Sequence, residues 1–139
     1  MDRLKYKIRE DEFMEIDGKV TTGYGKAAYF LGQEFYKEKF KKKCGFTPFP
    51  GTLNIIIPKT KQNTINTIKN NCNNIIKPNK DFGGVKYVKA TLNNKIKGAI
   101  IFPEKTTHEI HYLEFISKDK LRDKLNLKDG DTVTIKFEN

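Results

Sequence analysis

The chain has 139 residues, a length that predicts a single domain whose core needs no disulfide or structural metal. Lysine and arginine outnumber aspartate and glutamate by 27 to 17, and the net charge of +10 favours a polyanionic partner such as a nucleotide or nucleic acid. The basic residues are spread along the chain, which also fits an ordinary solvated surface, and the apolar runs are too short for a membrane-spanning helix.

The N-terminal part is predicted to contain an extension, a strand and a glycine loop. Residues 1–13 are highly charged and lack turn signals, so we expect an extension before a single domain over residues 14–139. A strand is predicted over residues 13–22, followed by a loop in which two glycines bracket Tyr24. The amides of such a loop, with Lys26 beside them, suit an anion, but an ordinary tight loop between strand and helix has the same composition.

A helix is predicted over residues 32–43. Its aromatic residues Phe35, Tyr36 and Phe40 share one stripe, which favours packing against the domain, and Gly45 is placed to end the helix.

Residues 45–54, GFTPFPGTLN, combine rigid prolines with oxygen-bearing side chains. They lead into an apolar run over residues 53–57 that predicts a buried strand. Thr52 and Asn54 then share one face of this strand, so a hydroxyl and an amide oxygen lie side by side as ligands suited to a phosphate-bound Mg²⁺. The same residues also fit a turn in which Thr and Asn only satisfy backbone groups.

The second half of the chain is predicted to be rich in strands. A short helix or ordered excursion is expected within residues 59–80, because its isoleucines keep rough helical spacing. Six or so strands with one or two peripheral helices predict a small closed barrel, because closure removes exposed sheet edges. After the helix, the expected elements are a strand at 85–92, an Asn93-Asn94 turn, its hairpin partner at 96–102, a strand at 111–117, a helical turn at 118–125, a tight turn at 127–131 and a final strand at 132–137.

Glu114 is an oddity in the apolar strand at 111–117. A carboxylate there lies either at a sheet edge facing water or in a site that holds it.

The cysteines, Cys44 and Cys72, are too few and too far apart for a zinc site, and we expect both to be reduced in a cytoplasmic protein. If the segment that holds His108 and His111 is a strand, the two side chains point to opposite faces and cannot share a metal.

Several motifs occur together and in a recognisable order along the chain. They are Thr22-Gly23-Tyr24-Gly25 with Tyr29-Phe30, Pro50-Gly51-Thr52-Leu53-Asn54, Lys97-Gly98-Ala99-Ile100-Ile101 with Pro103, Lys105-Thr106 and His108, and Lys120-Leu121-Arg122 with Leu127-Lys128-Asp129-Gly130-Asp131. Together they resemble the archaeal CTP-dependent riboflavin kinase family over roughly residues 16–137. The resemblance implies a mainly β, six-stranded cradle-loop barrel that transfers the γ-phosphoryl group of CTP to the 5′-hydroxyl of riboflavin, forming FMN and CDP.

The same resemblance implies roles for individual residues. Thr52 and Asn54 would hold Mg²⁺, while Thr106, or its neighbour Thr107, and Glu114 would contact the flavin. As a hypothesis, Glu114 is also the general base that orients or deprotonates the ribityl hydroxyl. Two segments would contact the nucleotide, namely Gly23, Tyr24, Gly25, Lys26, Ala27, Ala28 and Tyr29 on one side, and Asp119, Lys120, Leu121 and Arg122 on the other.

One departure from the family pattern is Ala27, where relatives commonly have a third glycine. Alanine keeps the loop if its φ is negative, whereas a positive φ would be costly.

Two other functions compete with this interpretation. A small basic barrel that binds nucleic acid would need basic and aromatic residues clustered on one strand face, and the sequence shows no such cluster. A kinase of the same family with another nucleotide or acceptor also fits the motifs. We expect a cytoplasmic monomer that uses neither nucleic acid nor a membrane.

Overall fold

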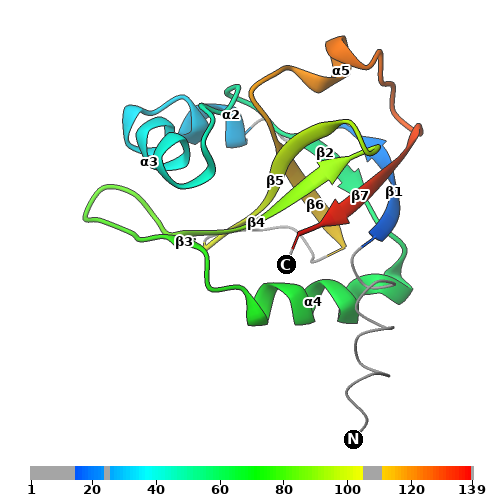
Figure 1. Cartoon of the computed structure of the whole chain (residues 1–139), viewed down its shortest axis with the longest axis horizontal. Helices are drawn as coiled ribbons and strands as arrows, with labels where there is room; N and C mark the ends of the chain where they lie inside the picture. Colours follow the sequence, from blue (N-terminus) through cyan, green and yellow to red (C-terminus); the bar gives the residue numbers. More distant parts are fainter. Residues whose placement is uncertain (1–14, 24–25, 105–110, 139) are drawn as a thin grey trace, which may run out of the picture.

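The structure is a computed structural model that describes residues 15–23, 26–104 and 111–138. Its seven strands form one antiparallel sheet in the order β3-β4-β5-β6-β2-β1-β7, and pairing of β4 with β7 closes six of them into a barrel (Figure 1). The predicted mainly β, six-stranded barrel is therefore confirmed, with β3 as an additional short strand beside β4. The strands are β1 (Glu15–Thr21), β2 (Leu53–Ile56), β3 (Ile75–Ile76), β4 (Val85–Leu92), β5 (Ile96–Pro103), β6 (Tyr112–Ile116) and β7 (Thr132–Phe137).

The helices are more numerous than the one or two that the sequence predicted. The expected helix after Gly32 is confirmed as α3, and Gly45 ends it with φ 85° and an amide that donates to the Lys41 carbonyl. The helix expected within residues 59–80 is also present, as α4. In the described residues the helices are α2 (Lys26–Leu31), α3 (Glu34–Cys44), α4 (Gln62–Asn71), α5 (Leu121–Lys124) and a 3₁₀ turn at Lys59–Lys61.

Helix α2 corrects the prediction of a long glycine loop over Gly23 to Tyr29. The helix already begins at Lys26, because Ala27 and Leu31 form an apolar face that packs onto the barrel wall. Among the described residues only Asn93, Asn94 and Asn126 combine a side chain with a positive φ, so Ala27 causes no backbone strain.

Two clusters of buried side chains hold the molecule together, one inside the barrel and one against its outer wall. The inner cluster contains Val133, Ile135 and Phe137, the alternating residues of β7, and Ile65 of α4. The outer cluster joins Leu31 of α2 and Phe40 of α3 to residues of β3–β6. Figure 1 shows α2 and α3 together on one side of the barrel and α4 below it. Helices α2 and α3 therefore cover part of the outer wall of the barrel.

The predicted hairpin turn between β4 and β5 is confirmed. Asn93 and Asn94 have φ 51° and 56°, as a two-residue turn of the I′ type requires. The Asn93 side chain also accepts a hydrogen bond from the Thr134 amide at 2.8 Å, which joins the turn to β7.

Both cysteines are free thiols in the described structure, in agreement with the prediction. Burial raises the pKa of the Cys44 thiol to about 11, because its effect is larger than the opposing effect of Lys89 and Lys43. The reactive thiolate is therefore scarce at neutral pH.

None of the described helices combines the length and apolar character needed to cross a bilayer.

Gly98 permits the closest approach between β5 and β6. A Cβ added there would lie 2.0 Å from the Ile116 carbonyl oxygen and 2.6 Å from Phe115 Cζ. Because backbone blocks the methyl group, we expect Gly98→Ala to lower the free energy of unfolding by at least about 2 kcal/mol, measured by urea denaturation. Gly83→Ala is the matched control, since its new Cβ comes no closer than 3.9 Å to Glu104. Equal stability of the two variants would contradict the prediction.

Candidate functional site

Oxygen atoms from β2 and β6 meet near one end of the barrel. The Thr52 hydroxyl lies 3.2 Å from Asn54 Oδ1 and 3.4 Å from Glu114 Oε2, and all three side chains are half-buried. Asn54 and Glu114 are opposite each other across the two strands. The alternation argument thus placed Thr52 and Asn54 together correctly, and the fold adds Glu114. We call these three residues the oxygen cluster.

Glu114 does not lie at a sheet edge. Its strand, β6, is paired on one side with β2 and on the other with β5, and Glu114 itself is opposite Asn54 and Ile101. Of the two alternatives left open by the sequence, the edge position is therefore wrong. The carboxylate is held beside the Thr52 hydroxyl, where it accepts a hydrogen bond.

Gly23 brings the end of β1 directly onto the oxygen cluster. A Cβ at this position would lie 2.3 Å from Asn54 Nδ2 and 2.8 Å from Asn54 Oδ1. Any side chain at Gly23 would therefore displace the Asn54 amide. The first glycine of the loop is needed for this close approach, since its backbone packs against one of the predicted metal ligands.

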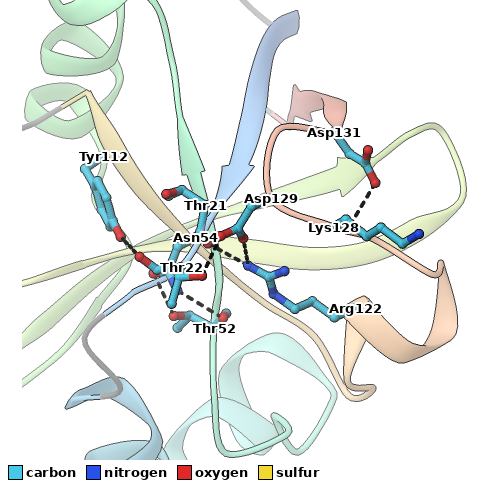
Figure 2. Close-up of polar contacts among 9 residues, drawn as sticks. All are labelled: Thr21, Thr22, Thr52, Asn54, Tyr112, Arg122, Lys128, Asp129 and Asp131. Atoms are coloured by element: carbon cyan, nitrogen blue, oxygen red, sulfur yellow. Dashed lines mark hydrogen bonds and ion pairs between the residues drawn. The ribbon is translucent and has the colours of Figure 1, made fainter.

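A second polar group, the Arg122–Asp129 clamp, joins the chain after β6 to the end of β1. The Arg122 guanidinium pairs with Asp129 and also donates to the Thr21 carbonyl at 2.9 Å. The Thr22 hydroxyl donates to the other Asp129 oxygen at 2.7 Å, and the Tyr112 hydroxyl donates to the Thr22 carbonyl at 2.8 Å. Figure 2 shows these side chains converging on Thr22, close to Thr52 and Asn54. The clamp thus fixes the residues that lead into Gly23.

We expect the Arg122→Gln substitution to alter one pKa selectively. Hydrogen bonds from Arg122, and then from Thr22, lower the pKa of the Asp129 carboxyl. The contribution of these bonds to the stability of the fold is therefore present above the usual pKa of aspartate and is lost as the pH falls through the lowered pKa. In Arg122→Gln the pKa of Asp129 should rise toward its usual value in an NMR titration. The pKa of Asp119, lowered mainly by its hydrogen bond to Lys124, should stay low. An unchanged pKa of Asp129 would contradict the pairing.

A pocket adjoins the oxygen cluster. It has a volume of about 160 Å³ and brings the predicted nucleotide segment, residues 119–122, next to Thr52. The side chain of Leu121 is mostly taken up by the barrel core, whereas Asp119 and Lys120 form ion pairs at the surface with Lys124 and Asp123. The lining residues are Phe49, Gly51, Thr52, Leu53, Phe115, Ser117, Asp119, Lys120, Leu121 and Arg122.

The other predicted nucleotide residues are distributed less uniformly. Ala27 is buried in the outer cluster, while Ala28 is exposed and Tyr29 has 78% of its surface exposed. Tyr24, Gly25 and Thr106 lie outside the described residues, as does Thr107.

Sequence reasoning missed Thr22, Tyr112 and Asp129 as parts of the polar groups. Asp129 lies in a motif of the family resemblance, but aspartate before glycine is also typical of a tight turn, and nothing in the local pattern indicates its pairing with Arg122 and Thr22. Among the described residues there is no group of three or more His, Cys, Asp or Glu side chains that could hold a metal ion.

The fold and the site together define a class of protein, namely a small closed β-barrel with a pocket beside an oxygen cluster, suited to a small ligand. The family model CTP-dep_RFKase, described as a domain of unknown function, DUF120, matches residues 20–137. The chain belongs to the CTP-dependent riboflavin kinase family.

Curated relatives agree with this family. The riboflavin kinase of Methanobrevibacter smithii is 66% identical over 89% of this chain and 100% of its own length. The riboflavin kinase of Methanosphaera stadtmanae is 43% identical over 90% of this chain and 98% of its own length. That of Methanothermobacter thermautotrophicus is 42% identical over 84% of this chain and 93% of its own length.

Proposed function

We propose that this protein is a riboflavin kinase that transfers the γ-phosphoryl group of CTP to the 5′-hydroxyl of riboflavin, forming FMN and CDP. The observation that supports this most directly is the oxygen cluster, in which Thr52, Asn54 and Glu114 lie together in a chain of this family. Phosphoryl transfer needs little covalent help from a protein, but it needs charge neutralisation and in-line positioning.

The oxygen cluster suits a Mg²⁺ ion that arrives with the nucleotide. Thr52 and Asn54 supply neutral oxygens 3.2 Å apart, and a magnesium ion carried by phosphates needs only one or two protein ligands. When bound, the ion would neutralise the negative charge that the phosphate oxygens bear. Gly23 contributes indirectly, because its bare backbone keeps the Asn54 amide in place.

Glu114 is proposed as the general base. Its carboxylate is half-buried, on a central strand, and next to the proposed metal ligand Thr52. There it would hold the 5′-hydroxyl of riboflavin and accept its proton as the oxygen forms its bond to the γ-phosphorus and the bond to the CDP oxygen breaks. Thr106 is proposed as a further flavin contact.

The nucleotide is proposed to lie between two segments, residues 23–29 and residues 119–122. The Arg122–Asp129 clamp supports this arrangement, because it ties the second segment to Thr22, which directly precedes the first. The single barrel carries all the described site residues, and we propose that the protein acts as a cytoplasmic monomer.

An end-point assay tests the proposal. Purified protein is incubated with riboflavin and Mg²⁺ and with either CTP or ATP, and the flavins are separated by chromatography. FMN with CTP and little with ATP is the expected result. FMN with ATP alone would keep the kinase and reject the nucleotide. No FMN with either would reject the proposal and favour the nucleic-acid-binding alternative.

A further inference from the structure

The backbone of Phe49 is fixed at both its hydrogen-bonding groups. Its amide donates to the Ser117 carbonyl at 2.7 Å, and its carbonyl accepts from the Gly51 amide at 2.8 Å. Pro48 and Pro50 flank it and restrict the backbone on both sides. The residue is therefore held in one backbone conformation between β2 and the chain after β6.

The ring of Phe49 packs into neither hydrophobic cluster. It is half-buried, absent from the inner and outer clusters, and pairs with no other aromatic ring among the described residues. It lies over Gly51 instead, since a Cβ added at Gly51 would come within 3.3 Å of Phe49 Cε2. A preorganised aromatic ring outside the core, on the wall of a pocket, is typical of a ligand contact.

The rest of the pocket indicates the chemistry of that ligand. Thr52 of the oxygen cluster is one of its lining residues, and Asp119, Lys120 and Arg122 are others. Its volume of about 160 Å³ is well below the roughly 300–1,000 Å³ of sites that enclose a whole drug-sized ligand. A space of this size, next to a proposed phosphate-bound metal, suits one flat ring of a nucleotide whose remaining parts lie outside it.

We propose that Phe49 provides the aromatic face on which the base of the nucleotide stacks in this pocket. The inference rests on the proposed function and names the residue that contacts the base. Gly51 leaves room for the Phe49 ring, because a side chain at this position would push against it.

Three variants test the inference. Stacking of a base on an aromatic ring contributes about 1–3 kcal/mol, so Phe49→Ala is expected to weaken CDP binding roughly 5- to 100-fold, measured by titration calorimetry with Mg²⁺ present. Phe49→Leu keeps the apolar volume but has no aromatic face and should weaken binding similarly. Phe49→Tyr keeps the face and should bind CDP nearly as the wild type does. KM for riboflavin should be unchanged in all three.

Calorimetry separates this inference from the kinase reaction, because it measures nucleotide binding without turnover. Loss of CDP affinity in both the alanine and leucine variants supports the inference even if no FMN forms. Wild-type affinity in Phe49→Ala would overturn it, as would a normal Phe49→Leu, which would show that only apolar volume matters. A riboflavin KM that rises while CDP affinity is kept would also overturn it, by assigning the ring to the flavin.

Discussion

Replacing Glu114 by glutamine is expected to lower kcat for FMN formation roughly 100- to 10,000-fold while the affinity for CTP stays near that of the wild type. Glutamine keeps the size of the side chain and an oxygen that can accept from the Thr52 hydroxyl, which lies 3.4 Å from the carboxylate. It cannot accept the proton of the ribityl hydroxyl. The loss should therefore appear in turnover, measured by single-turnover FMN formation alongside equilibrium binding of CTP.

Glu38→Gln is the matched control for this experiment, because Glu38 makes the same chemical change on the exposed side of α3. Its activity should equal that of the wild type. Near-normal turnover of Glu114→Gln would reject the role of general base and leave only flavin binding. An equal loss of CTP affinity would instead indicate that Glu114 acts through the metal ligands.

Replacing Asn54 by alanine is expected to raise the Mg²⁺ concentration needed for half-maximal activity by at least roughly 10-fold. Removing the amide deletes one of two neighbouring neutral oxygens, and changes even outside the direct ligands of a metal commonly cost about 10- to 100-fold in affinity. The measurement is a Mg²⁺ titration of the initial rate at saturating CTP and riboflavin.

Asn66→Ala makes the same change at an exposed position of α4 that is not part of the oxygen cluster, and its Mg²⁺ dependence should match the wild type. If Asn54→Ala also showed an unchanged Mg²⁺ requirement, Asn54 would be removed from the proposed metal site. Thermal unfolding of both variants distinguishes a loss of metal binding from a loss of fold, since Asn54 is only half-buried.

The structure explains why the polar groups of the site were only partly predictable. The adjacency of Thr52 and Asn54 followed from strand alternation alone, because residues two apart on a strand share a face. The contact of Thr52 with Glu114 required the pairing of β2 with β6, which joins residues 62 positions apart.

Local sequence by itself determined the elements whose signals lie within a few residues. The alternation of residues 132–137, the Asn93-Asn94 turn and the helix end at Gly45 all follow from backbone preferences and side-chain periodicity, and all three are present. Tertiary structure alone decided that Glu114 lies inside the sheet and that Asp129 pairs with Thr22, which is 107 residues away. Closure of the barrel sets these neighbours, because strand order depends on the packing of the whole chain and not on any local pattern.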